Sequence, residues 1–446
     1  MQAYDSRLRR VVGGTFWLAL YVTLSLTPLL VAFVYRDHPP RDFWTEFSVA
    51  LGFVALAMIG LQFAITARFR HIAAPYGIDI VLRFHRQISI LAAALAVAHP
   101  MILFATREDA LGLLNVLTAP WRARFAVAAT LALLVLVAIS VWRRQLRLRY
   151  EHWRTAHGAL AVLALAFALA HIELVGWYVD LPWKRLLWAA MTLAVVCLLL
   201  YVRFVVPIRL LRLPWVVDEV VAERGRAWTL MLRPVDHDGI RFLPGQFAWL
   251  TIGRSPFAIE DHPFSFSSSA EDRELVAMTI KEAGDFTNGV GALTPGTPAY
   301  LEGPHGAFSI DRYEGKGCVF VAGGVGITPV MSMLRTLADR GDTRPQLLVY
   351  GARRWQDVTF REELEALRAR LDLRIVYVLS EAPPDWQGAR GRITAELLAG
   401  HLPDDDRAAY LYWVCGPPAM MDAAERSLLR AGVPWPSIYT ERFNLV

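Results

Sequence analysis

Four histidines lie at matched spacing in two apolar stretches. His85 and His99 are fourteen residues apart in HRQISILAAALAVAH. His157 and His171 are fourteen residues apart in HGALAVLALAFALAH. At about 100° per residue, fourteen steps return close to the same helix face, and at about 1.5 Å per residue they separate the side chains by about 21 Å. Two such helices packed together predict two bis-histidine haem sites, His85 with His157 and His99 with His171.

Other interpretations of these histidines stay open. A histidine inside a membrane can simply be a hydrogen-bond partner between helices, although ionisable groups there are functional candidates by default. Zinc is disfavoured, because two ligands about 21 Å from the next pair make a poor tetrahedral site. A transporter-like bundle without haem is the remaining alternative.

The elements that must position the histidines are apolar segments long enough to cross about 30 Å of hydrocarbon. We expect helices near 12–34, 47–66, 82–105, 122–142, 153–175 and 184–205. Arginines are dense before the first segment, between the second and third, and between the fourth and fifth. These loops and both termini are therefore expected in the cytoplasm, in a multi-pass protein of the cell inner (plasma) membrane. His85 and His157 then lie near the inner face, and His99 and His171 near the outer face.

The bulk composition excludes other classes. The 446 residues are 55% hydrophobic and carry a net charge of +5, with arginine concentrated around the apolar segments. We attribute that charge to membrane topology and expect no nucleic-acid partner. The three cysteines stand in different contexts and suggest no disulfide framework.

The second half of the chain has the sequence pattern of a soluble protein. Short strands with turns between them, such as AWTLMLRPV and QFAWLTIG, predict a small antiparallel β-barrel up to about residue 312. From residue 317, strands alternate with helices, which predicts a doubly wound parallel α/β sheet. The expected domains are a six-helix membrane all-α bundle over 1–210, a barrel over 211–313 and an α/β domain over 314–446.

Three motifs of the α/β part have the pattern of a dinucleotide site. GGVGITPV follows a strand and opens a helix, where backbone and helix N-terminus favour a phosphate, and it contributes Gly323, Gly324, Gly326, Thr328 and Pro329. Arg353 and Arg354 follow the next strand and would suit a 2′-phosphate, which favours NADPH over NADH; a solvated loop is the alternative.

The third motif is Cys415, Gly416 and Pro417, which ends a strand at the same sheet edge and should face the nicotinamide. The alternative for Cys415 is a small buried hydrophobe.

Together with HPFSFSSS (262–269), TIKEAGDFT (279–287), GPHG (303–306) and a terminal ERF, these motifs resemble the ferredoxin–NADP reductase module. Joined to a helical domain with paired histidines, the chain resembles the ferric reductase and NADPH oxidase superfamily over nearly its whole length. The resemblance implies FAD, NADPH and two haem b as cofactors. We therefore expect the barrel to bind FAD, the α/β domain to bind NADPH and the helical bundle to bind the two haems.

The resemblance also implies roles for particular residues. Phe264 and Ser265 would lie along the flavin, Gly284 and Thr287 would take its pyrophosphate, and Phe443 would cover the ring. His262 stands where soluble relatives often carry an arginine. The full cofactor-binding set is His262, Pro263, Phe264, Ser265, Lys281, Gly284, Thr287, Gly303, Gly306, Gly323, Gly324, Gly326, Thr328, Pro329, Arg353, Arg354, Cys415, Gly416, Pro417 and Phe443. Cys415 and Phe443 are the two expected to act as catalytic residues.

The implied activity is transmembrane electron transfer from cytoplasmic NADPH through FAD and the two haems to an acceptor on the outer face. Oxygen giving superoxide is the first expectation, a ferric chelate the second, and a conduit to a quinone or protein partner a third from another class. Small molecules and membrane lipid are the expected partners. No obligatory protein partner is expected, since the chain has no EF-hand loop. Five arginines could bind haem propionates or lie at the membrane surface: Arg83, Arg86, Arg107, Arg122 and Arg124.

Overall fold

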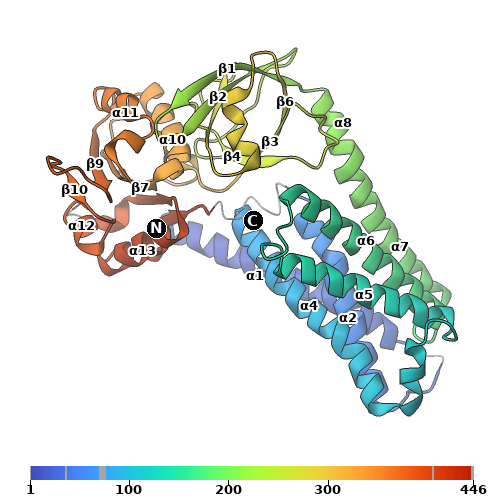
Figure 1. Cartoon of the computed structure of the whole chain (residues 1–446). Coiled ribbons are helices and arrows are strands. Elements are labelled where there is room, and N and C mark those ends of the chain that lie inside the picture. The colour runs from blue at the N-terminus through green and yellow to red at the C-terminus, as the bar shows by residue number, and fades with distance from the viewer. Residues whose placement is uncertain (1, 36–37, 70–76, 404–405, 443–446) are drawn as a thin grey trace. The chain divides into compact units, whose positions relative to one another are not determined.

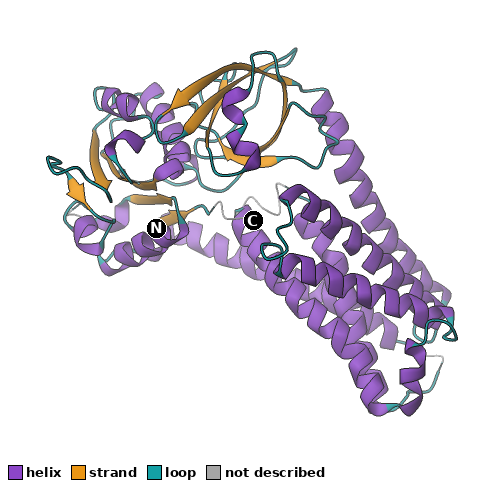
Figure 2. Cartoon of the chain, viewed as in Figure 1, coloured by secondary structure: helices purple, strands orange, loops and turns teal. Residues whose placement is uncertain are grey.

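The computed structural model describes residues 2–35, 38–69, 77–403 and 406–442, with side chains from Val12 onward. The chain forms two compact units (Figures 1 and 2). The helical unit ends at Val206, and the second unit comprises the chain from Pro207 onward together with residues 77–79 of the described part. Each unit is described by itself.

The helical unit consists of long apolar helices. Among the described residues, six helices are long and apolar enough to cross a membrane, which confirms the six predicted segments and makes the chain a multi-pass membrane protein. They are α1 (Gln2–Phe33), α2 (Phe43–Thr66), α4 (Ile78–Thr106), α5 (Trp121–Val141), α6 (Tyr150–Val175) and α7 (Pro182–Leu200), the last continuing through a π-helical turn at Tyr201–Val205 into α8 (Val206–Leu211). A 3₁₀ turn at Glu108–Leu114 follows α4.

Small side chains let the central helices approach one another. Ala132 and Leu133 of α5 pack with Ala164 of α6, and Ala93 and Ala96 of α4 lie against this cluster. The cluster lies along the helices between the levels of the two histidine pairs, so the alanine-rich stretches of the sequence form the packing surface of the bundle.

The first sheet of the second unit is antiparallel and forms a half-barrel. Its order is β4-β3-β6-β1-β2-β5, and Phe266, just after β4, pairs with Met278 of β5. The strands are β1 (Trp215–Glu223), β2 (Ala227–Pro234), β3 (Phe247–Ile252), β4 (His262–Ser265), β5 (Val276–Lys281) and β6 (Pro298–His305), with the short helix α9 (Asp285–Asn288) after β5. An antiparallel half-barrel therefore stands where the sequence predicts a barrel. Strands β4 and β6 were not among the strands that the sequence analysis named.

The second sheet is parallel, with the order β10-β9-β8-β7-β11-β12, which confirms the predicted doubly wound arrangement. Its strands are β7 (Cys318–Gly323), β8 (Gln346–Ala352), β9 (Leu373–Leu379), β10 (Ala389–Arg390), β11 (Leu411–Cys415) and β12 (Ile438–Thr440). Its helices are α10 (Ile327–Asp339), α11 (Arg361–Leu367), α12 (Ala395–Ala399) and α13 (Pro418–Arg430). The chain winds from β7 to β8 and β9 on one side and then to β11 on the other, so the topological switch point lies between β7 and β11.

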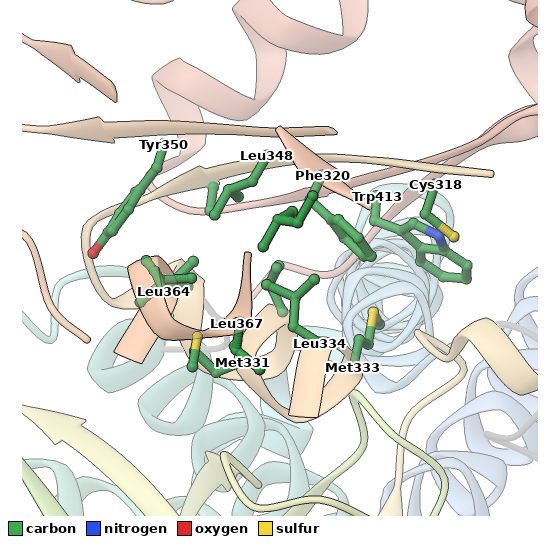
Figure 3. Close-up of a cluster of buried hydrophobic side chains, with 14 of the residues drawn as sticks. Cys318, Phe320, Met331, Met333, Leu334, Leu348, Tyr350, Leu364, Leu367 and Trp413 are labelled. Carbon is green, nitrogen blue, oxygen red and sulfur yellow. The ribbon is translucent and has the colours of Figure 1, made fainter. Parts of the chain in front are cut away.

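Successive side chains of β7 point alternately to the two faces of this sheet. Cys318 and Phe320 point to the face covered by α10 and α11, where Leu334 and Leu364 pack against them (Figure 3). Val319 and Val321 point to the other face and join the cluster beneath α12 and α13. A strand buried on both faces explains the continuous apolar run CVFVAG.

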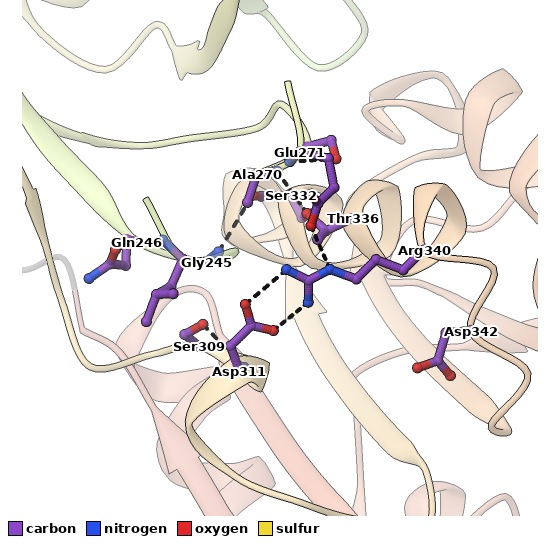
Figure 4. Close-up of polar contacts among 12 residues, drawn as sticks. Gly245, Gln246, Ala270, Glu271, Ser309, Asp311, Ser332, Thr336, Arg340 and Asp342 are labelled. Carbon is purple, nitrogen blue, oxygen red and sulfur yellow. Dashed lines mark hydrogen bonds and ion pairs between the residues drawn. The ribbon is translucent and has the colours of Figure 1, made fainter. Parts of the chain in front are cut away.

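Polar contacts from α10 connect the half-barrel to the parallel sheet. The Gly245 amide donates to Ser332 Oγ at 3.4 Å, and the Ala270 amide donates to Thr336 Oγ1 at 2.9 Å. The Arg340 guanidinium reaches Asp311 at 2.6 Å and Glu271 at 2.6 Å (Figure 4). One face of α10 thereby connects the half-barrel and its following segments to the parallel sheet at several separate points.

Candidate functional site

The structure brings together the histidines that the sequence pairs. The ring centroids of His85 and His157 are 6.4 Å apart, and those of His99 and His171 are 6.5 Å apart. In each pair, one ring comes from α4 and the other from α6. The near-equal separations follow from the equal spacing along two helices that run in the same direction.

Each of the four imidazoles is anchored through Nδ1 by a neighbouring helix. We name the pairs by the orientation that the sequence predicts, the inner pair being His85 with His157 and the outer pair His99 with His171. In the inner pair, His85 Nδ1 lies 2.7 Å from Gln62 Oε1 of α2, and His157 Nδ1 lies 3.0 Å from Ser140 Oγ of α5. In the outer pair, His99 Nδ1 lies 2.9 Å from the Ser48 carbonyl. Its partner His171 Nδ1 lies 2.8 Å from the carbonyl oxygen of Arg122.

The neighbours of these anchors fix their hydrogen-bond roles. A main-chain carbonyl can only accept. The Ser140 hydroxyl donates to the Leu136 carbonyl at 2.7 Å, so its oxygen is left to accept from His157. The Gln62 amide nitrogen lies 3.3 Å from the Met58 carbonyl, which places Oε1 toward His85. All four Nδ1 atoms must therefore be the protonated, donating nitrogens.

With the proton on Nδ1, Nε2 of each ring carries a lone pair. The two rings of a pair then offer two acceptors to each other and no donor, so a direct histidine–histidine hydrogen bond is disfavoured. An electrophile between them would satisfy both lone pairs, and this arrangement is the usual outer-sphere support of metal-binding histidines.

The separation of the rings fits a linear bis-imidazole iron. An imidazole nitrogen binds a transition metal at about 2.0 Å and the ring centre lies about 1.15 Å behind it, so two rings on one metal have centroids about 6.3 Å apart. In the described ranges, no group of three or more His, Cys, Asp or Glu side chains could hold a metal ion. A two-ligand site of this kind needs a planar macrocycle for its remaining ligands, and the residues present fit haem.

A glycine makes room for the outer histidine. A Cβ at Gly52, one helical turn after Ser48, would lie 3.3 Å from Cγ of the His99 ring. Gly52, Ser48, Gln62 and Ser140 were all missed from the sequence. The available signal was a polar or glycine residue inside an otherwise apolar span, which is a functional candidate in a membrane.

The outer arginines differ in their contacts. Arg107 pairs with Asp109 at 3.4 Å. Arg124 donates to the carbonyls of Ala119 at 2.8 Å and Leu117 at 3.0 Å. The Arg122 side chain is exposed and has no ion-pair partner within the described part of the chain, while its carbonyl anchors His171. Of the three, Arg122 is the one with a free cation beside the outer pair.

The inner arginines of the sequence prediction are also exposed. Arg83 and Arg86 both lie on the surface of α4, in the helix that carries His85. Their role toward a haem propionate stays a prediction.

In the half-barrel, the HPFS motif forms β4 and builds an aromatic group. His262 stacks on Phe286 of α9 with centroids 4.0 Å apart, and Phe264 lies 5.9 Å from the same ring. Pro263 is partly exposed and Ser265 is buried. The structure thus gathers the predicted flavin motif and the segment after β5 in one place.

The segment after β5 has its own hydrogen bonds. The Ala283 and Gly284 amides donate to Thr287 Oγ1 at 2.8 and 2.9 Å, and Lys281 is exposed at the end of β5. In this structure Gly284 and Thr287, the two residues expected at the pyrophosphate, are therefore hydrogen-bonded to each other. Their role with FAD stays a prediction.

At the switch point, glycines allow close approach of two strand ends. A Cβ at Gly326 would collide with the Cys415 carbonyl, and one at Gly323 would collide with Met420. Gly416 would likewise press its Cβ on the Met420 side chain, beside the exposed Pro417. These glycines bring the turn after β7 against the end of β11, where a dinucleotide is expected.

The remaining residues of the glycine turn divide into open and buried positions. Gly324 has φ +53° and nothing within 4 Å of its would-be Cβ. Thr328 Oγ1 donates to the Val325 carbonyl at 2.8 Å, and Pro329 is buried beside it in the first turn of α10. The threonine hydroxyl closes the turn and leaves Gly324 facing open space.

The thiol of Cys415 lies in the hydrophobic core, with 1% of the residue exposed. Burial raises the pKa of this thiol well above its ordinary value. This burial fits the alternative of a small buried hydrophobe, and a role toward the nicotinamide stays a prediction.

A buried carboxylate near this position was missed from the sequence. Glu441 is 4% exposed, and burial raises the pKa of its carboxyl well above the ordinary value. Its Oε1 lies 2.8 Å from the position of a Cβ on Gly306, which has φ +102°. Gly303 packs its backbone against Ala248 of β3. Glu441 stood in the quoted ERF motif but was treated only as part of the resemblance, and Phe443 lies outside the described residues.

The two arginines after β8 are exposed and already paired. Arg353 Nε lies 2.6 Å from Glu381, and Arg354 Nε lies 3.2 Å from Asp357. Pairs this exposed contribute little to stability, so either guanidinium can exchange its carboxylate for a ligand phosphate.

Three family models match separate parts of the chain. They are a ferric reductase like transmembrane component at residues 51–168, an FAD-binding domain at 231–296 and an oxidoreductase NAD-binding domain at 320–426.

Curated relatives match the second half. A propane 2-monooxygenase reductase component from Rhodococcus jostii is 34% identical over 48% of this chain and 59% of its own length. A ferredoxin–NADP reductase B from Sorangium cellulosum is 34% identical over 38% of this chain and 71% of its own length. The chain spans about three fifths of the length of the first two such relatives.

Among solved structures, the ferredoxin reductase in carbazole 1,9a-dioxygenase is 25% identical, with a TM-score of 0.46 over 52% of this chain and 69% of that one. On the 34% identity to ferredoxin–NADP reductase B and the three family models, the chain belongs to the ferredoxin–NADP reductase family in its C-terminal half, and as a whole it has the architecture of the ferric reductase and NADPH oxidase family.

Proposed function

We propose that this protein moves electrons from cytoplasmic NADPH through FAD and two haem b to oxygen on the outer face of the plasma membrane, giving superoxide. The proposal keeps the domain division of the sequence, 1–210 for the di-haem bundle, 211–313 for FAD and 314–446 for NADPH. Both termini are then cytoplasmic, as the arginine-rich loops favour.

The observation that carries the proposal is the set of four Nδ1 anchors. Acceptors on neighbouring helices hold four imidazoles through Nδ1 and leave each Nε2 without a proton, in two pairs of rings whose centroids are 6.4 and 6.5 Å apart. A direct hydrogen bond within either pair is disfavoured, so helix packing alone does not explain the arrangement. A haem in each pair would supply one-electron chemistry, and the four histidines would hold the two irons.

The chain's own residues limit what can happen at the outer pair. If two histidines held each iron, the acceptor would be expected to react at the edge of the outer site, without binding to the metal. The exposed Arg122 guanidinium beside His171 would attract an anion there. Oxygen needs no dedicated binding residues, so the proposal requires no further site on the outer face.

In the second unit, the close approach of Gly326 to Cys415 and Gly416 supports a dinucleotide at the switch point. Arg353 and Arg354 support NADPH over NADH, since a guanidinium can bind the 2′-phosphate in two-point fashion. The aromatic group of His262, Phe264 and Phe286 supports a flavin at the half-barrel. These residues bind and orient; the hydride and electron chemistry belongs to the cofactors.

Reduction of a ferric chelate is the second candidate. It is favoured by the match of residues 51–168 to a ferric reductase like transmembrane component. An anionic chelate would also be attracted by Arg122. A conduit to a quinone or protein partner is the third candidate, and the names of the relatives, several of them reductase components, support it.

The test uses the full chain purified in detergent. The expected result is a b-type difference spectrum on reduction, two haems per FAD, and NADPH-driven cytochrome c reduction that superoxide dismutase abolishes. Fe(II)-chelate formation under nitrogen at a comparable rate would instead favour ferric reduction. A protein that binds FAD but no haem when haem is supplied would overturn the proposal.

A further inference from the structure

A chain of hydrogen bonds crosses three helices behind the inner histidine pair. The amide nitrogen of Gln62 on α2 donates to Tyr21 Oη of α1 at 3.3 Å and to the Met58 carbonyl at 3.3 Å. The amide oxygen of Gln62 accepts from His85 Nδ1 of α4 at 2.7 Å. Tyr21 lies outside the region matched by the transmembrane family model, which begins at residue 51.

The orientation of the Gln62 amide is set by these contacts. Met58 offers a carbonyl, which only accepts, so the amide nitrogen must face it and the oxygen must face His85. Gln62 is 8% exposed, in a helix that is otherwise apolar around it. A buried amide has no water to exchange with, so the contact with His85 is maintained.

The inner and outer pairs differ in the kind of group that anchors them. Both outer imidazoles have a main-chain carbonyl as acceptor, at Ser48 and Arg122, and His99 Nδ1 also lies 2.9 Å from Ser48 Oγ. Both inner imidazoles have side-chain acceptors, Gln62 and Ser140. A main-chain carbonyl cannot be replaced without moving a helix, whereas a side-chain acceptor can be changed by a single substitution.

We propose that Gln62 is the positioning residue of the inner pair. It holds the His85 imidazole as the Nδ1–H tautomer and strengthens Nε2 as an electron donor, and Tyr21 fixes the amide that does so. A hydrogen-bond acceptor on the distal nitrogen raises the basicity of a ligating imidazole. The inference rests on the proposed function, since its consequence is the reduction potential of the inner haem.

The direction of the effect follows from that basicity. A stronger imidazole donor stabilises ferric over ferrous iron and lowers the potential. In Gln62→Leu the acceptor is gone, so the inner potential should rise. In Gln62→Glu a carboxyl oxygen remains as acceptor, so the potential should stay equal to that of the wild type or fall below it.

The experiment is a potentiometric titration of the b-type absorption in the full-length protein, for wild type, Gln62→Leu, Gln62→Glu, Tyr21→Phe and a control. Thr66→Val is the matched control, because Thr66 lies one turn further along α2 and its hydroxyl bonds only within its own helix. We expect one of two components to shift upward in Gln62→Leu, a smaller upward shift in Tyr21→Phe, and no shift in Thr66→Val.

The outcomes separate the two proposals. A wild type without haem defeats the proposed function. If every variant binds two haems, either of two results overturns the role of Gln62 and leaves the proposed function standing. In the first, both reduction potentials are unchanged in Gln62→Leu. In the second, the potential rises equally in Gln62→Leu and Gln62→Glu. If Gln62→Leu loses the inner haem, its retention in Gln62→Glu supports the role and its loss in both overturns it.

Discussion

Substitution of Gly52 by valine tests the outer histidine site at a single position. A Cβ at Gly52 would stand 3.3 Å from His99 Cγ and 3.4 Å from Nδ1, slightly inside the usual contact distance of about 3.5–4.0 Å. Alanine should therefore need only a shift of a few tenths of an ångström. Valine adds two methyl groups, which a helix confines largely to one rotamer, and these must displace the ring from Ser48.

The size of the effect follows from two terms. Forcing methyl groups into a packed site costs about 1–3 kcal/mol. Loss of a supporting hydrogen bond to a metal-bound histidine typically weakens metal affinity by about 10- to 100-fold, or about 1.4–2.7 kcal/mol. We expect the outer haem of Gly52→Val to be lost on purification and the inner haem to remain.

The assay is the haem-to-FAD ratio of the purified full-length protein, from haem and flavin absorbance after denaturation. Wild type and Gly52→Ala should give about two haems per flavin, and Gly52→Val about one, on the bis-histidine assignment. Gly60→Val is the control, since Gly60 lies in the same helix and its Cβ would meet nothing within 4 Å. A Gly52→Val protein with the wild-type ratio would refute the reasoning, and so would a Gly60→Val protein with the same loss.

Three further predictions concern the second unit. Burial raises the pKa of Glu441 above its unfolded value, so folding takes up a proton and the free energy of unfolding falls as pH rises through and above about 4.5. Glu441→Gln should therefore be more thermally stable than the wild type at pH 8 and equally stable at pH 4. Equal gains in thermal stability at both pH values would contradict this. In steady-state kinetics, Arg353→Ala should raise KM for NADPH about tenfold and leave KM for NADH unchanged. An equal change in both KM values would mean that Arg353 acts only through its exposed ion pair with Glu381 and does not bind the 2′-phosphate. Gly326→Ala should abolish NADPH oxidation while FAD stays bound, since its methyl group meets the Cys415 carbonyl, and an oxidation rate within a factor of two of wild type would argue against a nucleotide at this turn.

The sequence predicts the helices and the histidine pairing well, because both depend on local periodicity. Fourteen residues of apolar helix fix which side chains share a face, and the arginine-rich loops predict which helices run in the same direction. The two rings of each pair then meet without further information.

What the sequence does not reveal is the partner of each ring. Gln62 and Ser140 contact histidines 23 and 17 residues away, on other helices, and no periodicity relates them. Strands β4 and β6 overlap the HPFS and GPHG motifs, which the sequence analysis treated only as parts of the resemblance. The burial of Glu441 is likewise a tertiary property.

The contacts of α10 have a consequence for turnover. Residues that precede this helix in the chain contact it and its C-cap at three positions, Ser332, Thr336 and Arg340. The half-barrel and the parallel sheet should therefore rotate and translate together. A donor seated on one half and an acceptor on the other would then keep a constant gap from cycle to cycle. Their reaction would run at a rate set by tunnelling distance and driving force, without a closure step, and its temperature dependence should show no contribution from domain motion.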